Sequence, residues 1–177
     1  MELIKNFQEQ QDKISNIYND KAKVYGASWC VMRYSSFLTQ LYIKAYRIKT
    51  IEEQDAHVID DDAYTDFQGI ANYAVKAILA IKHELSNMNE SAIKTIYLSE
   101  LSACHTLVEA KNTDYGDVWK FMEQSDFTDF ILVKIERLRN IHKKSTHITD
   151  NLTIMVSILR DIHNYAIFAC IYLNNKK

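Results

Sequence analysis

Apolar residues recur at three- and four-residue intervals along most of the chain, which is the pattern of helices that bury one face. Leu3, Phe7 and Ile14 begin the first such stripe, which predicts a helix that ends near Tyr25-Gly26. Between the stripes lie two polar stretches, residues 54–61 and 86–91, which we interpret as a loop and a linker. The predicted helices cover about residues 1–25, 37–53, 62–85, 92–111, 127–143 and 152–173.

Pairs of residues ninety positions apart show that the chain contains an internal duplication. Tyr25-Gly26-x-x-Trp29-x-x-Met32 returns as Tyr115-Gly116-x-x-Trp119-x-x-Met122. Nine identities fall in the 27 aligned positions of residues 25–51, where chance gives roughly one or two. Asn72-Tyr73-Ala74 then recurs as Asn164-Tyr165-Ala166, with a shift of two further residues. The chain is therefore a tandem pair, with residues 1–86 as the first unit and 91–177 as the second.

The predicted helices and the repeat together define the expected fold. Each unit holds three helices that are apolar on one side, and those sides must be buried against one another. The chain has no Pro and three Gly, and two of these Gly belong to the repeated Tyr-Gly pair, so few positions would break a helix. We predict an all-α six-helix bundle in which the two units pack as one globular domain, related by a pseudo-two-fold axis.

Composition and charge exclude several classes of protein. Residues are 47% apolar and 25% charged, which is typical of a globular chain. No uninterrupted apolar run reaches the roughly 20 residues of a membrane span, so we expect a cytoplasmic protein without membrane contact. The three Cys lie far apart, so neither a disulfide framework nor a zinc site is indicated. A net charge of −2 argues against duplex nucleic acid as a partner but not against a small anion.

Polar residues recur in the repeat beside the aromatic ones, and this suggests a binding site. Two cations three residues apart share one helical face and can grip a phosphate, or else form salt bridges at a solvated surface. A Trp can stack on a base or cap the core, and a buried Asn can contact a ligand edge or fix helix register. The repeated candidates for a nucleotide site are Lys44, Arg47, Asn72, Trp29 and Tyr25 in the first unit, and Lys134, Arg137, Asn164, Trp119 and Tyr115 in the second.

Acidic residues are distributed unequally between the two units. Asp62 and Asp66 lie four apart on one predicted face, and with Glu52 they form a candidate Mg²⁺ platform, because Mg²⁺ prefers carboxylates together with phosphate oxygens. Alternatively, the run Asp60-Asp61-Asp62 caps the helix that follows it. The six His have no shared ligand spacing, and neither a Ser-His-Asp pattern nor a phosphate loop is present.

Three segments of the second unit resemble a known family. These segments are Lys111-Asn112-x-Asp114-Tyr115-Gly116-x-x-Trp119, Ser125-x-Phe127-Thr128-Asp129 through Lys134-x-x-Arg137, and Asp161-Ile162-x-Asn164-Tyr165-Ala166. They are similar to the nucleotide-modification-associated domain 1 family of bacteria and phages, and the first unit looks like the other copy of its tandem members. The resemblance implies an association with modified nucleotides and adds Asp129 and Asp161 to the candidate site. In the first unit Thr39 stands in place of Asp129 and Gly69 in place of Asp161. The second unit is therefore the more complete copy.

Three functions remain open from the sequence. The leading hypothesis is a protein that binds a nucleotide or modified nucleotide, with the phosphate on the Lys/Arg pairs and the base near a Trp or Tyr. The second is a Mg²⁺-dependent nucleotide pyrophosphohydrolase that resembles the MazG-like and dimeric dUTPase enzymes, although their motif of Glu-x-x-Glu followed by Glu-x-x-Asp is missing. The third is a non-catalytic phage or host interaction module, in which the cations pair with internal acids and no pocket exists. Whether the chain forms a homo-oligomer is also open.

Overall fold

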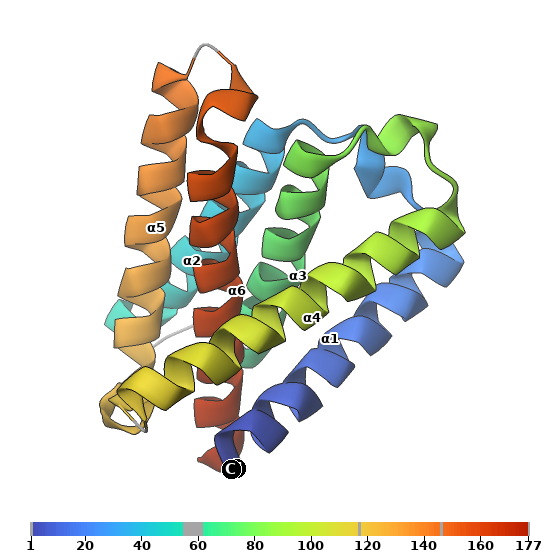
Figure 1. Cartoon of the computed structure of the whole chain (residues 1–177). Coiled ribbons are helices and arrows are strands. Elements are labelled where there is room, and N and C mark those ends of the chain that lie inside the picture. Colours follow the sequence, from blue (N-terminus) through green and yellow to red (C-terminus); the bar gives the residue numbers. More distant parts are fainter. Residues whose placement is uncertain (1, 55–61, 117, 146, 177) are drawn as a thin grey trace.

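Six α-helices account for nearly all of the chain in the computed structural model, which describes residues 2–54, 62–116, 118–145 and 147–176 (Figure 1). Within those ranges no β-strand occurs, and the predicted all-α six-helix bundle is confirmed. Short 3-10 turns precede α2, α4, α5 and α6, and the sequence pattern did not predict them. The helices are α1 (Glu2–Tyr25), α2 (Tyr34–Gln54), α3 (Ala63–Lys82), α4 (Glu90–Tyr115), α5 (Gln124–Lys144) and α6 (Leu152–Asn175).

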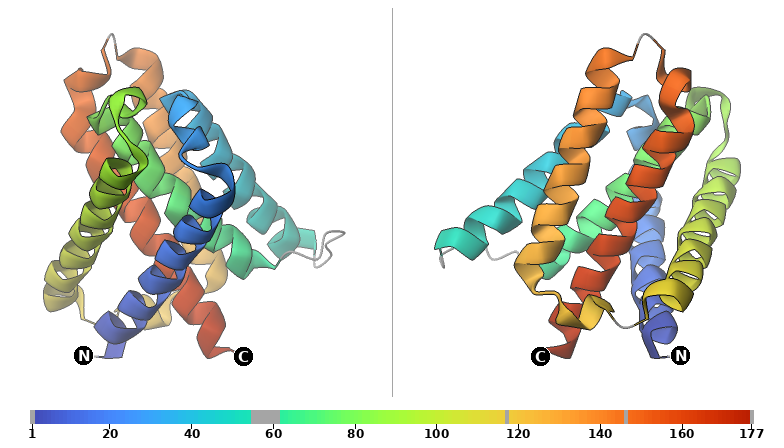
Figure 2. Two further views of the ribbon diagram at one scale, coloured as in Figure 1. Left: turned by 90° about the vertical axis from the view of Figure 1, so that its right-hand side faces the viewer. Right: turned by 60° about the vertical axis from the view of Figure 1, so that its left-hand side comes forward.

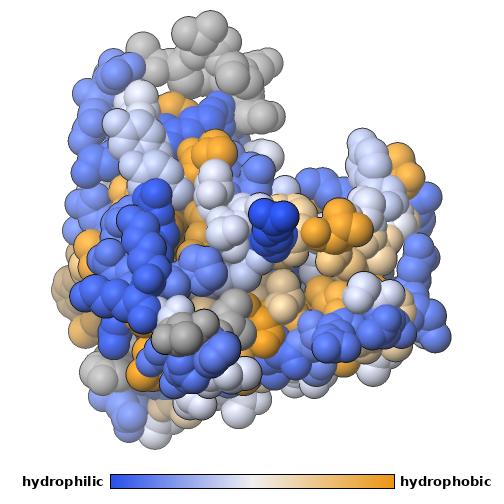
Figure 3. Space-filling view, turned by 90° about the horizontal axis from the view of Figure 1, so that it is seen from above, coloured by the Kyte–Doolittle hydropathy of each residue, from blue (hydrophilic) through white to orange (hydrophobic). Residues whose placement is uncertain are grey.

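Each helix packs against its counterpart in the other unit, as a pseudo-two-fold arrangement requires. The contacting pairs are α3 with α6, α2 with α5, and α1 with α4. Helices α2, α3, α5 and α6 form a four-helix core, and α1 and α4 lie side by side across one face of it (Figures 1 and 2). Both termini lie at the same end of the molecule (Figure 2). Seen from above, hydrophilic side chains cover most of the opposite end, and apolar ones form small patches (Figure 3).

The repeated Tyr-Gly pair ends the first helix of each unit. Gly26 and Gly116 have φ values of +55° and +56°, a region that residues with a Cβ rarely adopt. Their N–H groups donate to the carbonyls of Ala22 and Asn112 at 2.8 and 3.0 Å, which closes the last helical turn. The 3-10 turns η1 (Ser28–Val31) and η3 (Val118–Phe121) follow and carry the two Trp residues. The position of each Trp therefore depends on this glycine stop.

The first helix of each unit also packs on the opposite unit. Phe7 of α1 is fully buried, and its ring lies 5.7 Å from that of Phe168 in α6. Tyr97 of α4 is fully buried as well, and its hydroxyl donates to Asn72 of α3 at 3.2 Å. These contacts join the two units into one interlocked core.

The last helix is the most apolar element. A stretch over Thr149–Asn175 is long and apolar enough to cross a membrane by length and composition alone. However, 61% of the apolar window within it is buried inside the bundle, so the packing of the core already accounts for its composition.

Candidate functional site

A pocket of about 360 Å³ lies in the second unit, where the end of α4 meets η3, α5 and α6. Its size falls within the range of small-molecule sites. Most of its wall is apolar or aromatic, and Leu3 of α1 closes one side. The polar residues that line it are Lys111, Asn112, Asp161 and Asn164, and its aromatic residues are Trp119, Phe130, Tyr165 and Phe168.

Several polar atoms at this pocket have no hydrogen-bond partner. In the described part of the chain, six buried side-chain nitrogen or oxygen atoms lack a partner, and four of them belong to residues that line the pocket. They are both amide atoms of Asn164, the indole N–H of Trp119 and the amide oxygen of Asn112. Asn164 is only 4% exposed. Because an unpaired buried polar group costs about 1–3 kcal/mol, these atoms make the pocket a candidate site for a polar ligand.

The charged residues at the pocket neutralise one another for the most part. Asp161 accepts hydrogen bonds from Lys111 at 2.6 Å and from Lys134 at 2.8 Å. Burial raises the pKa of Asp161, but the two lysine hydrogen bonds outweigh this effect and hold the pKa below its ordinary value. The Lys134 ammonium also lies 5.7 Å from the centre of the Tyr165 ring. Two cations thus face one carboxylate, which leaves a single net positive charge.

In the first unit the position beside the asparagine is filled by protein, and the hollow that remains near Tyr18, Ala22 and Gly26 is not lined by Asn72. Asn72 corresponds to Asn164, but its amide oxygen accepts the hydroxyl hydrogen of Tyr97. Tyr97 in turn stacks on Tyr18, with ring centres 4.0 Å apart. In the ninety-residue register, Phe7 stands where Tyr97 stands and offers no hydroxyl to Asn164. One hydroxyl group therefore separates the paired amide oxygen of Asn72 from the unpaired amide oxygen of Asn164.

A second difference concerns the residue one turn after each Asn. Phe168 in the second unit stacks on Trp119, with ring centres 6.1 Å apart. Its counterpart in the first unit is Lys76, whose ammonium lies 5.1 Å from the Trp29 ring and within 5.8 Å of two tyrosine rings. Burial, with a smaller contribution from Lys21, lowers the pKa of Lys76 to about 8. The lysine thus occupies the space beside Trp29.

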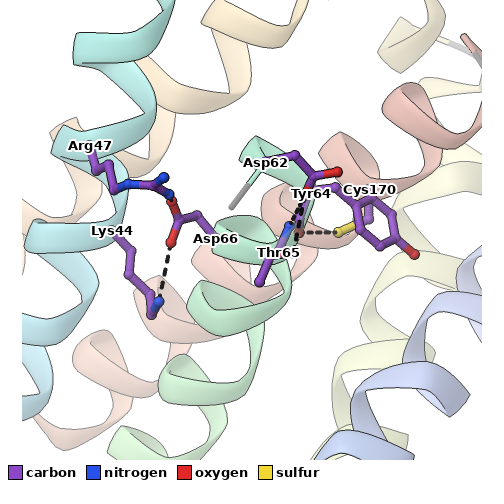
Figure 4. Close-up of polar contacts among 7 residues, drawn as sticks. All are labelled: Lys44, Arg47, Asp62, Tyr64, Thr65, Asp66 and Cys170. Atoms are coloured by element: carbon purple, nitrogen blue, oxygen red, sulfur yellow. Dashed lines mark hydrogen bonds and ion pairs between the residues drawn. The ribbon is translucent and has the colours of Figure 1, made fainter. Parts of the chain in front are cut away.

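The first predicted Lys/Arg pair is engaged by an internal acid. Lys44 donates to Asp66 at 3.2 Å, and Arg47 forms an ion pair with the other oxygen of the same carboxylate (Figure 4). Asp66 is 4% exposed. The Lys44 side chain crosses α3 so closely that a Cβ on Gly69 would lie 2.7 Å from Lys44 Cε. A side chain at position 69 would require the end of Lys44 to shift, whereas Asp161 occupies the same position in the second unit and binds Lys134 itself.

The second Lys/Arg pair is divided between two surfaces. Lys134 faces Asp161 on α6, whereas Arg137 lines a separate groove between α2 and α5 together with Asp129. Three residues of the predicted nucleotide set, Trp119, Asp161 and Asn164, line the pocket directly. Tyr25, the last residue of α1, is 67% exposed, and the side chain of Tyr115 lies outside the described residues.

The three acids of the predicted Mg²⁺ platform have separate roles. Asp62 caps α3 by accepting the Thr65 backbone N–H at 2.9 Å, as the capping alternative predicted. Glu52 accepts hydrogen bonds from Gln124 at 2.7 Å and Thr128 at 2.9 Å, which links α2 to α5. Among the residues described, no group of three or more His, Cys, Asp or Glu is placed to hold a metal ion. Asp60 and Asp61 lie outside the described residues.

Among the polar and aromatic residues that line the pocket, five were not predicted as site residues from the sequence: Lys111, Asn112, Phe130, Tyr165 and Phe168. Lys111-Asn112 and Tyr165 stand within the motifs that carry the family resemblance, so these motifs held the signal for them. Phe168 differs from its counterpart Lys76, and identity between the repeats could not have found it. The interaction-module hypothesis required paired cations and no pocket; Lys44, Arg47 and Lys134 are paired, but a pocket exists.

Comparison with known proteins identifies one family. The family model described as nucleotide modification associated domain 1 matches residues 21–81 and residues 111–173. The two matches cover more than half of the chain and fall one in each unit, as expected for a tandem pair. No curated protein and no solved structure matches the chain significantly.

Proposed function

The chain belongs to the nucleotide modification associated domain 1 family, and we propose that the pocket of its second unit binds the base of a nucleotide or modified nucleotide. The observation that carries this proposal is Asn164, whose amide donor and acceptor are both buried at an aromatic-lined pocket without a partner. The family name supports a nucleotide as the class of ligand.

The chemistry of the pocket suits a nucleobase. Every base carries a hydrogen-bond donor next to an acceptor on one of its edges, and a primary amide complements such a pair. The Trp119 indole N–H and the Asn112 amide oxygen supply one further donor and one further acceptor. Aromatic rings along the wall add stacking surface for a planar ring. Asn164 therefore aligns the base edge while the aromatic side chains contact its faces.

A single phosphate group would lie at the edge of this pocket. Lys111 and Lys134 both donate to Asp161, and together the three residues carry one net positive charge. A phosphate that approaches this edge accepts from the lysines, which already point toward an anion. In this arrangement Lys44 and Arg47 contribute nothing to the ligand, because Asp66 occupies both of them.

The test is calorimetric titration of the protein with nucleosides and nucleoside 5′-monophosphates, including modified pyrimidines. We expect Asn164→Leu to weaken the best ligand at least tenfold, which corresponds to about 1.4 kcal/mol. Asn72→Leu, the matched change in the closed unit, should leave the affinity unchanged in protein that circular dichroism shows to be folded.

A third variant acts without removing any pocket atom. Phe7→Tyr offers Asn164 the hydroxyl that Tyr97 offers Asn72, so it should compete with the ligand and lower its affinity. Equal affinity in wild type, Asn164→Leu and Phe7→Tyr would overturn the proposal. Repeating the titration with Mg²⁺ tests the expected contribution of that ion.

A further inference from the structure

A groove between α2 and α5 runs beside the pocket and has a volume of about 900 Å³. We call it the α2–α5 groove; it contains Tyr42, Tyr46 and Lys49 of α2 together with Asp129, Glu136, Arg137 and Lys144 of α5. It includes Arg137 and Asp129, two residues of the site set predicted from the sequence that the pocket does not use.

Two tyrosines give the groove a stacking surface. The rings of Tyr42 and Tyr46 lie 5.6 Å apart and within 21° of parallel. Tyr46 is 53% exposed, and the Arg139 guanidinium lies 5.0 Å from the Tyr42 ring centre. Tyr42 is partly buried, and an aromatic stack with one exposed ring and a flanking arginine is a surface on which unpaired bases bind.

The groove also holds the cations that the pocket lacks. Its two acids are engaged, since Asp129 lies 3.5 Å from Lys49 and Glu136 lies 2.7 Å from Arg139. Arg137 and Lys144 form no ion pair with any residue that the structure describes. Their charges are therefore available to phosphate groups.

One helix connects the groove to the pocket. On α5, Phe130 lines the pocket, while the neighbouring Asp129 and Val133 line the groove. Phe130 and Val133 are 44% and 68% exposed, so an apolar surface lies between the two sites. A ligand that places a base in the pocket can therefore continue over α5 into the groove.

We propose that the α2–α5 groove binds the backbone and neighbouring bases of a single-stranded nucleic acid, one base of which enters the pocket. This inference rests on the proposed function of the pocket. A free nucleoside triphosphate would need several cations at the pocket, where one net positive charge is present. A single strand instead distributes its phosphates along the groove. In a duplex the bases are paired and stacked inside the double helix, so they could not stack on the tyrosines.

The experiment measures fluorescence anisotropy of a labelled ten-nucleotide strand, as DNA and as RNA, with its duplex and heparin as comparisons. We expect one of the two strands to bind at least tenfold more tightly than the duplex or heparin. Arg137→Gln and Lys144→Gln should each weaken the strand severalfold and reduce the slope of log affinity against log salt by about 0.7. Lys94→Gln, which removes the same charge from α4, should change neither quantity.

Variants of the pocket and of the stacking surface complete the test. Tyr46→Leu should weaken the strand at unchanged salt slope, and Asn164→Leu should do the same by removing the base contact. A nucleoside that binds the pocket as tightly as any strand would overturn the strand proposal and leave the proposed function intact. If calorimetric titration shows that the wild-type protein binds no nucleoside or nucleotide, the proposed function itself is overturned. Equal binding of heparin or of an acidic peptide would show a general anion surface and would also overturn the strand proposal.

Discussion

At the scale of single residues, the two units differ most at the partner of one asparagine. Asn72 accepts from the Tyr97 hydroxyl, whereas the amide of Asn164 has no partner in the described chain. The sequence predicted both Asn residues as site candidates because they recur. It favoured the second unit only through Asp129 and Asp161, and could not compare the partners of the two Asn, because Phe7 and Tyr97 lie in helices that share a register but few identities. The difference becomes visible only when α1 and α4 are packed against the opposite units.

Exchanging these two aromatic residues should move stability in opposite directions. Tyr97→Phe leaves the Asn72 oxygen buried without a donor, and we expect a loss of about 1–3 kcal/mol. Phe7→Tyr supplies a donor to Asn164, and we expect a gain of about 1 kcal/mol. Urea unfolding of the three proteins measures both values. A destabilised Phe7→Tyr would show that the Asn164 amide lies beyond the reach of position 7.

His163 makes stability depend on pH. The ring is fully buried, with Nδ1 2.9 Å from the Ala71 carbonyl and Nε2 3.1 Å from the Gln11 amide. Burial lowers its pKa to about 4, although the Ala71 hydrogen bond opposes the shift. In the unfolded chain the pKa of His163 is ordinary, near 6.5. Between pH 6.5 and 4 the unfolded chain therefore binds a proton at this ring, whereas the folded protein does not. Stability should therefore fall by about 3 kcal/mol as pH drops through this window.

His163→Gln provides the comparison for that pH dependence. The variant lacks the titrating ring, so its urea midpoint should fall less between pH 6.5 and 4 than that of the wild type. The carboxylates titrate in both proteins and cancel in the difference. Parallel midpoints would contradict the assignment of a neutral buried His163.

At the scale of elements, periodicity predicted helix positions well and helix neighbours poorly. All six predicted helices exist, and Tyr25-Gly26 ends α1 as predicted, whereas α4 continues to Tyr115, beyond its predicted end near residue 111. Lys134 and Arg137 lie three residues apart on α5, yet Lys134 forms an ion pair with Asp161 of α6 and Arg137 lines the α2–α5 groove. Likewise, Asp66 was predicted as a metal ligand and lies between Lys44 and Arg47. Tertiary packing decides which neighbouring helix contacts a given helix face. The residue spacing within one helix does not predict that neighbour.

The Asp66 ion pairs should contribute to stability and not to binding. Asp66→Ala leaves Lys44 and Arg47 half-buried without their carboxylate, and because both cations keep some solvent contact we expect a loss of about 2 kcal/mol. Urea unfolding measures the loss, and calorimetric titration should show unchanged nucleotide affinity. The triple variant with Lys44→Met and Arg47→Met should recover part of the stability. A change in ligand affinity would restore Lys44 and Arg47 as candidate phosphate contacts.

At the scale of the whole molecule, the two units differ because one has a pocket beside its asparagine and the other has that position filled by side chains. In the first unit that position is filled by Tyr18, Tyr97 and Lys76. Their register counterparts in the second unit are Val108, Phe7 and Phe168. Because the closed site uses its own side chains as occupants, titration should give one nucleotide bound per chain. A stoichiometry of two would show that Tyr18 and Lys76 can be displaced.

The two units should also be unable to fold separately. In the isolated fragment 1–86, Phe7 would lose its contacts with α6, and the apolar face of α3 would lose its largest partner. Fragment 91–177 would likewise expose Tyr97 and the inner face of α6. Circular dichroism should therefore show little helix in each fragment, recovery of helix when the two are mixed, and a single unfolding transition for the intact chain. A fragment that is helical and unfolds cooperatively alone would show that each unit is an independently stable domain. The contacts of α1 and α4 with the opposite unit would then be additions to stable units.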